Sequence, residues 1–191
     1  ADGSKSMIQQ VRDLASGYRF PMLCSDQHLA GEEIAAHLKN LIGEYGAPLF
    51  IKRDNGGNQN HSAVNDVLAA HSIIPLNSPH YYAPYNGSVE KAQDDLKKVL
   101  RRRLQHVDIP PLQHFKEYAD AAAHELNHKP RKVLKGNHAC RIFFEKKYWV
   151  SFTRTERREI YEWLEERSAI ILESEPDISS TSIASAWRLS C

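Results

Sequence analysis

The stretch from Phe50 to Glu90 constrains this chain more than any other part of it, because it sets two acidic residues in informative positions. Asp54 follows a short apolar run and precedes the turn-forming residues Asn55, Gly56 and Gly57. An acidic residue at the carboxyl end of a strand lies where open α/β sheets bind their ligands. Glu90 lies in the first turn of a predicted helix capped by Asn86, where a carboxylate interacts favourably with the helix dipole.

A Pro- and Tyr-rich loop, Ser78 to Gly87, separates these acidic residues and has neither a helical nor a strand period. Together, the Asp54-Asn55-Gly56 turn, this loop and Glu90 resemble the catalytic core of retroviral integrases and bacterial insertion-sequence transposases. That family has an Asp before Asn-Gly, a Ser-Pro-x-Tyr-x-Pro-x-Asn-Gly loop, and a Glu three residues after the loop's Gly. The spacing from Asp54 to Glu90 is also similar to that of the family.

The resemblance covers roughly residues 1–143 and points to Asp2, at a family-like distance before Asp54, as the third acidic residue. Asp13 is the alternative candidate for this position. The resemblance implies that Asp2, Asp54 and Glu90 are catalytic and hold two Mg²⁺ or Mn²⁺ ions, with Asp2 bridging both. Three bare carboxylates would repel one another, and all-oxygen ligation suits these ions better than zinc. Two such ions can stabilise the attacking and leaving oxygens of a phosphoryl transfer.

The closing segment of the resemblance departs from the family pattern, which is usually Asn-x-x-Arg-Pro followed by Leu-x-Gly-x-Thr-Pro. Asn127 and Pro130 match, but Lys129 replaces the Arg, and His138-Ala139 replaces the Thr-Pro pair. This departure weakens any inference about partners from this segment, but it does not affect the inference about the three acidic residues.

Strands and helices alternate along the chain, which predicts an α/β domain with helices on both faces of one sheet. The resemblance implies a ribonuclease H-like three-layer α/β/α fold, in which three antiparallel strands are followed by two strands added through helices. We therefore expect a five-stranded mixed sheet, with the Asp54 and Glu90 carboxylates converging at its edge. Residues 1–144 would form this core, with a truncated first strand, and residues 145–191 a helical C-terminal appendage or linker. The predicted strands are Met7 to Val11, Tyr18 to Cys24, Pro48 to Arg53 and Ile73 to Leu76. The predicted helices are Glu32 to Tyr45, His61 to His71, Glu90 to Gln105, Leu112 to Asn127 and Thr153 to Ser168.

The net charge of +1 does not indicate a nucleic-acid partner, so any case for DNA rests on local patches. Lys97, Lys98 and Arg101 follow Glu90 along its helix and are predicted to contact DNA phosphates, although such runs are often only a solvated face. From the loop, Asn86 is a predicted DNA contact, and Tyr81 either stacks on a splayed base or packs within the loop.

The composition is that of an ordinary globular protein, and no apolar run is long enough to span a membrane. Three cysteines without a paired spacing favour a reduced, cytoplasmic setting, close to the nucleoid if the protein is a bacterial transposase. Ten scattered histidines, without paired cysteines, do not indicate a zinc site.

Three function classes follow. The first is a DDE-type DNA strand transferase of a mobile element, which nicks DNA ends and joins them to target DNA during integration or recombination, acting as a homo-oligomer. The second is a ribonuclease H-like nuclease that cuts without joining. The third is a catalytically silent module that binds DNA or protein. The Pro79 to Tyr85 segment is expected to be loose without DNA and to become ordered when DNA and metal bind.

Overall fold

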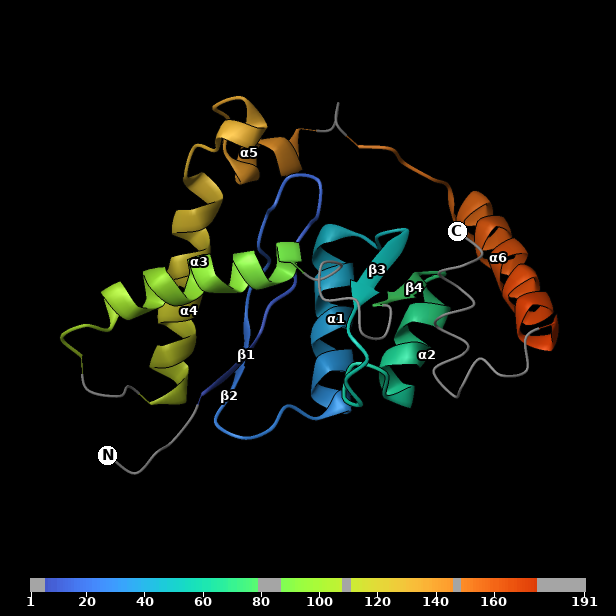
Figure 1. Cartoon of the computed structure of the whole chain (residues 1–191), viewed down its shortest axis with the longest axis horizontal. Coiled ribbons are helices and arrows are strands. Elements are labelled where there is room, and N and C mark those ends of the chain that lie inside the picture. Colours follow the sequence, from blue (N-terminus) through green and yellow to red (C-terminus); the bar gives the residue numbers. More distant parts are fainter. Residues whose placement is uncertain (1–5, 79–86, 108–110, 146–148, 175–191) are drawn as a thin grey trace. The chain divides into compact units, whose positions relative to one another are not determined.

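The computed structural model describes residues 6–78, 87–107, 111–145 and 149–174 (Figure 1). The chain forms two compact units. The first contains Ala1–Leu29 and Gly87–Val150, and the second contains Ala30–Asn86 and Ser151–Cys191. The division expected from the sequence, at residue 144, stays a prediction.

The first unit contains a short antiparallel pair, β1 (Met7–Gln9) and β2 (Leu23–Ser25), in which Met7 faces Ser25. Beyond this pair, the described part of the first unit adds one isolated antiparallel bridge, between Arg12 and Arg19. The bridge flanks a tight turn that Asp13 closes, because its carboxylate accepts hydrogen bonds from the Ser16 backbone N–H and hydroxyl at 2.7 and 2.5 Å.

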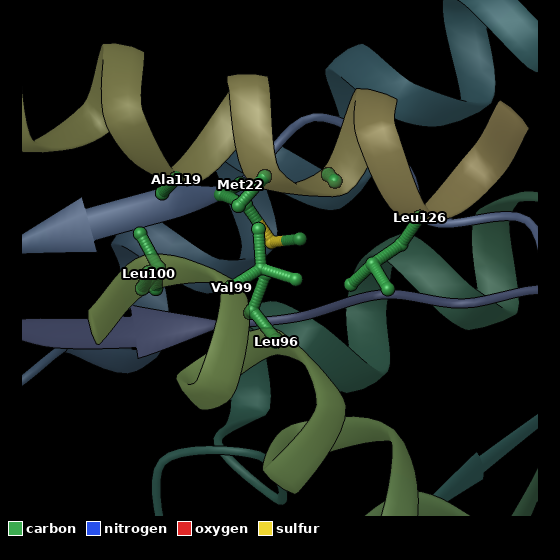
Figure 2. Packing of buried hydrophobic residues seen from close by; sticks show 8 residues of the cluster. Met22, Leu96, Val99, Leu100, Ala119 and Leu126 are labelled. Carbon is green, nitrogen blue, oxygen red and sulfur yellow. The ribbon is translucent and has the colours of Figure 1, made fainter. Parts of the chain in front are cut away.

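Two long helices complete the first unit, α3 (Gly87–Arg103) and α4 (Leu112–His128), and Figure 1 shows them crossing. Figure 2 shows Met22 enclosed between them. Met22 is fully buried, and each helix contributes aliphatic side chains at helical spacing. The cluster around Met22 consists of Leu96, Val99, Leu100, Ala119, Ala122, Ala123 and Leu126.

A 3-10 turn (η2, Lys132–Leu134) and a short helix, α5 (Ala139–Phe144), follow α4 and were not predicted from the sequence. His138 caps α5, because its Nδ1 accepts a hydrogen bond from the Arg141 backbone N–H at 3.1 Å. A histidine ring thus provides the side-chain acceptor that Ser or Thr usually supplies at this position of a helix. The departure from Thr-Pro at His138-Ala139 therefore leaves the helix start intact.

The second unit contains α1 (Gly31–Tyr45), β3 (Phe50–Arg53), α2 (Ser62–Ala70), β4 (Ile74–Asn77) and α6 (Arg154–Ser174). The strands β3 and β4 are parallel, and Arg53 pairs with Asn77 at their carboxyl ends. Helix α6 packs its Leu164 against Ile74 of β4. The Arg157 guanidinium donates to the Ala47 and Pro48 carbonyls at 3.0 and 2.6 Å, which holds the start of α6 against this unit.

The expected five-stranded sheet is wrong for the residues that the structure describes, which form two separate two-stranded sheets. Side chains of α4 form hydrogen bonds with backbone N–H and C=O groups that would pair with a neighbouring strand in a larger sheet. Asn127 accepts from the Arg19 N–H and donates to the Arg19 carbonyl, both at 2.8 Å, and Asp120 accepts from the Met22 N–H at 2.8 Å. The Arg19 backbone and the Met22 N–H are thus satisfied by a helix instead of a further strand. Tyr18 and Phe20 bond to the backbone of Asp13 and Val11. The mixed α/β character of the chain is confirmed.

None of the helices in the described ranges is long and apolar enough to cross a membrane.

Candidate active site

The carboxyl ends of β3 and β4 are fixed by a buried arginine. The Arg53 guanidinium donates to Asn77 Oδ1 at 2.8 Å, to the Gln59 carbonyl at 2.7 Å, and to Asn65 Oδ1 at 2.8 Å. Burial lowers the pKa of Arg53 to about 10, and the three acceptors are neutral groups. The side chain therefore stays charged at neutral pH and ties the end of β3 to β4 and to the loop before α2.

Asparagine side chains extend this network around the turn that follows β3. Asn77 Nδ2 donates to Asn60 Oδ1 at 2.6 Å and to Asn55 Oδ1 at 3.3 Å. Asn55 Nδ2 in turn donates to the Ser78 carbonyl at 2.9 Å. The Ser78 backbone N–H and hydroxyl both donate to the Arg53 carbonyl, at 3.0 and 3.1 Å. The turn after β3 is thus tied to the residue that follows β4.

Asp54 is exposed at the start of this turn. Its Oδ1 accepts a hydrogen bond from the Gly56 N–H at 2.9 Å, which fixes the carboxylate over the turn. A Cβ on Gly56 would lie 2.9 Å from Asp54 Oδ1, so this carboxylate position requires a glycine there. No hydrogen bond from a described residue to Asp54 Oδ2 is present, so this oxygen can bind a ligand.

Glu90 is exposed in the first turn of α3, as predicted. Two arginines from the N-terminal segment of the first unit hold the first two turns of α3. Arg12 Nη1 donates to the Ser88 carbonyl and Arg19 Nη2 to the Ala92 carbonyl, both at 3.3 Å. Glu90 belongs to the first unit and Asp54 to the second. The convergence of the two carboxylates stays a prediction.

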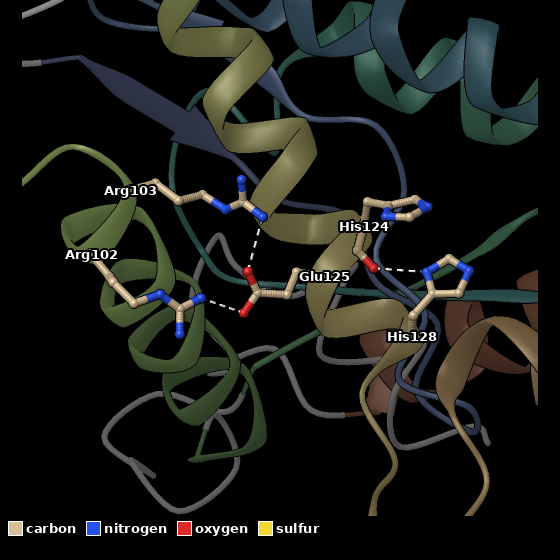
Figure 3. Close-up of polar contacts among 5 residues, drawn as sticks. All are labelled: Arg102, Arg103, His124, Glu125 and His128. Carbon is tan, nitrogen blue, oxygen red and sulfur yellow. Dashed lines mark hydrogen bonds and ion pairs between the residues drawn. The ribbon is translucent and has the colours of Figure 1, made fainter. Parts of the chain in front are cut away.

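The basic face of α3 divides into two parts. Lys97, Lys98 and Arg101 are exposed, and none forms an ion pair with a residue that the structure describes. Arg102 and Arg103 both bind Glu125 of α4, the Arg103 bond being 2.9 Å long (Figure 3). The first three side chains are therefore available to a ligand, whereas the last two hold α3 to α4. DNA contact by Lys97, Lys98 and Arg101 stays a prediction.

The remaining predicted site residues lie outside the described ranges. These are Asp2, Tyr81 and Asn86, together with the Pro79 to Tyr85 segment that was expected to become ordered on binding DNA. Within the described ranges, no three His, Cys, Asp or Glu side chains form a group that could hold a metal ion.

No family model matches this sequence, and no curated protein matches it. Its structure is similar to those of retroviral integrases. A chain of the simian T-cell lymphotropic virus intasome matches with a TM-score of 0.62 and 16% identity over 78% of this chain and 56% of that chain. The HTLV-2 integrase catalytic core in complex with magnesium, in its trimeric form, matches with a TM-score of 0.53 and 21% identity, covering 72% of this chain and 93% of that core. The BIV integrase catalytic core matches with a TM-score of 0.56 and 19% identity, covering 75% of this chain and 95% of that core.

This chain has the fold of a retroviral integrase catalytic core. The resemblance drawn from the Asp54 turn, the Pro- and Tyr-rich loop and Glu90 is therefore confirmed at the level of the fold. The matched part is the core, because this chain spans only about half of the intasome chain but nearly the whole of the two isolated cores.

The residues of this integrase-core fold fit a hard divalent cation by their chemistry. Asp54 offers a carboxylate that is exposed, held by one backbone N–H and without a bond to any described basic side chain. Glu90 offers a second exposed carboxylate, at the end of α3 where a negative charge is favoured. Both donors are oxygens, which Mg²⁺ and Mn²⁺ prefer.

Sequence reasoning missed the residues that hold the Asp54 turn in place. The strand pattern places Arg53 only at the end of a buried strand, and it assigns no role to Asn60, Asn65 or Asn77. A signal was present: asparagines recur at positions 55, 58, 60, 65 and 77, a density that a solvated loop does not need. Which of them would meet a buried guanidinium depends on the parallel pairing of β3 with β4, which brings residues 53 and 77 side by side.

Proposed function

We propose that this chain is the catalytic core of a DNA strand transferase of the integrase and transposase type, which nicks DNA ends and joins them to target DNA. The observation that carries the proposal is the exposed Asp54 carboxylate, fixed by the Gly56 N–H directly after a strand of an integrase-core fold. A carboxylate whose only role was to close the turn would not need the buried hydrogen bonds of Arg53 and Asn77 that fix the turn in place.

Asp54 and Glu90, together with Asp2, are the residues that would hold divalent metal ions. When bound, two Mg²⁺ or Mn²⁺ ions would neutralise the carboxylates and stabilise the attacking and leaving oxygens of the phosphoryl transfer. The chain's own contribution is positional. The Gly56 N–H and the Arg53 network fix the direction of the Asp54 carboxylate, and the first turn of α3 presents Glu90.

The proposed partners are the ends of a mobile element and a target DNA. Lys97, Lys98 and Arg101 would bind phosphates on the exposed face of α3, beyond Glu90. We also propose a homo-oligomeric active form. The HTLV-2 integrase cores with this fold are described as dimeric and trimeric, and the simian viral chain as part of an intasome.

The test is a nicking and strand-transfer assay with duplex oligonucleotide ends, a supercoiled target and Mg²⁺ or Mn²⁺. Glu90→Gln and Asp54→Asn should each lower both activities by orders of magnitude, because each removes a charge that would bind metal. Asp66→Asn, an equivalent change at an exposed residue of α2, is the matched control and should retain activity. Affinity for DNA should stay the same or rise in the two site variants, because a negative charge near phosphate has gone.

Activity of Glu90→Gln near the parent level, with Mg²⁺, would refute the assignment. Two other results would redirect it. Metal-dependent nicking without joining would make the protein a ribonuclease H-like nuclease. DNA binding by the parent chain without either activity would make it a silent binding module. Thermal melting of every variant separates these results from loss of folding.

A further inference from the structure

Three arginines, Arg12, Arg19 and the distant Arg131, act on one another electrostatically in the first unit, and two of them meet at Gly17. Arg131 Nη1 and Arg12 Nη2 lie 2.1 and 2.7 Å from the point that a Cβ on Gly17 would occupy. Gly17 has a φ of +76°, in the left-handed region that favours glycine. The missing side chain at Gly17 thus leaves the space in which two guanidinium groups meet.

The third arginine, Arg19, is close enough to the other two to interact with their charges and is almost fully buried. Arg19 is 4% exposed, and its Nε has no hydrogen-bond partner among the described residues, although its Nη2 donates to the Ala92 carbonyl. Burial, and then the charges of Arg12 and Arg131, lower the pKa of Arg19 to about 10. Arg19 therefore remains protonated at neutral pH and adds a third positive charge at the same place.

No acidic residue among those described neutralises this cluster by a direct ion pair. The two carboxylates that act on Arg12 from nearby, those of Asp13 and Asp95, have other partners. Asp13 accepts from the Ser16 N–H and hydroxyl, and Asp95 pairs with Lys91 at 3.4 Å. Salt screens the repulsion between like charges less when they are partly buried, so the cluster favours an anion.

The three arginines do not have the same role. Arg12 and Arg19 donate to the Ser88 and Ala92 carbonyls, so both also brace the first turns of α3. The Arg131 side chain makes no hydrogen bond or ion pair with a described residue, and it is only half-buried. Its backbone is nevertheless fixed, because its N–H donates to the Asn137 carbonyl at 3.0 Å. Bracing α3 explains the first two arginines and leaves Arg131 unexplained.

We propose that Arg131 and Arg12, backed by the charge of Arg19, bind a phosphate group of DNA beside the first turn of α3. A guanidinium group presents its donors in a planar fork that matches two phosphate oxygens, and Arg131 has its whole fork available. Because Ser88 and Ala92 precede and follow Glu90 in that turn, a phosphate held here would lie near the proposed catalytic carboxylate. The choice of DNA as the phosphate donor rests on the proposed function.

The test combines a direct probe of the parent protein with two pairs of variants. In the parent, the arginine side-chain N–H resonances are followed by NMR while a short DNA duplex, or inorganic phosphate alone, is added. For the variants, the affinity for the duplex is measured by fluorescence anisotropy over a range of salt concentrations. Arg131→Ala is compared with Lys132→Ala, which removes the same charge from the neighbouring exposed residue. Arg131→Lys keeps the charge and loses the planar fork.

The duplex should shift the Arg131 and Arg12 resonances. Arg131→Ala should weaken duplex binding by about tenfold and reduce the salt dependence by about one ion, and Arg131→Lys should recover only part of the affinity. Lys132→Ala should have a much smaller effect. Equal losses in Arg131→Ala and Lys132→Ala, or resonances that the duplex leaves unmoved, would overturn the site. A response to inorganic phosphate but not to the duplex would overturn its assignment to DNA.

These outcomes are separate from those of the strand-transfer assay. If the duplex shifts the arginine resonances but the parent protein has no metal-dependent activity, the phosphate site stands and the proposed function fails. If the parent protein is active while Arg131→Ala binds the duplex normally, the proposed function stands and the phosphate site fails. The titration of the parent protein decides the question even if a variant does not fold.

Discussion

Arg53 and Asn77 are the last residues of the two parallel strands, and the Arg53 Nε donates to Asn77 Oδ1 at 2.8 Å. Both residues are buried, at 8% and 2% exposure. A charged side chain is rarely buried to this extent unless its donors are satisfied. This bond therefore connects the strand pairing, which the core stabilises, to the turn that carries Asp54.

Asn77→Ala should lower the free energy of unfolding by about 2–3 kcal/mol, because it removes the acceptor of the buried Arg53 Nε and the donor to Asn60 Oδ1 and Asn55 Oδ1. Urea denaturation measures the change. Asn40→Ala, at an exposed position of α1, is the matched control and should change the free energy by less than about 0.5 kcal/mol. Equal effects of the two variants would show that the network does not stabilise the unit.

Gly56→Ala should lower strand-transfer activity by about tenfold or more with little change in stability. The added methyl group would lie 2.9 Å from Asp54 Oδ1 and would displace the carboxylate, and under the proposed function a small displacement of this group is costly. The control is Gly57→Ala, where the methyl group meets nothing within 4 Å. Activity of the two variants is compared in the nicking and joining assay, and unchanged activity in Gly56→Ala would contradict the role of the turn.

Met22→Ala should lower the free energy of unfolding by about 2–5 kcal/mol, because it removes a fully buried side chain between α3 and α4 and leaves a cavity. The other methionine of the chain provides the control: Met7 is 41% exposed, so Met7→Ala should cost less than about 1 kcal/mol. Denaturant unfolding, followed by tryptophan fluorescence and circular dichroism, measures both. Similar losses would show that the core is not packed around Met22.

Glu125→Gln should destabilise the protein by less than about 1 kcal/mol at neutral pH, since its ion pairs with Arg102 and Arg103 are partly exposed. The hydrogen bond from Arg102, followed by that from Arg103, holds the pKa of Glu125 below its ordinary value of 4.5, while burial acts in the opposite direction. A carboxylate with a lowered pKa stabilises the folded state above its unfolded pKa and loses this effect as the pH falls.

The difference between the parent and Glu125→Gln should therefore be largest above pH about 5 and disappear on acidification below 4.5. High salt should also reduce it. Thermal melting across this range measures the effect, with Glu117→Gln, an exposed position on α4, as the control. A difference that stays constant with pH would exclude the ion pairs as its cause.

The sequence predicted the order and type of the main elements because their periodicities are local. The start of α3 just before Glu90 and the strand that ends at Arg53 agree with the structure to within a few residues. The Asn-Gly turn after Asp54 also follows from residue chemistry alone. Each of these features depends on residues that are neighbours in the chain.

The sequence by itself thus determined which acidic residues follow a strand or begin a helix, and the similarity to integrase cores. Only the tertiary structure decided that the Asn127 side chain takes the backbone bonds of Arg19 in place of a strand, and that Arg53 is buried against Asn77. The gathering of Arg12 and Arg131 over Gly17 is likewise tertiary. These contacts join residues far apart in the chain, so no local period encodes them. They depend on which backbone groups remain unpaired once the helices and strands have packed.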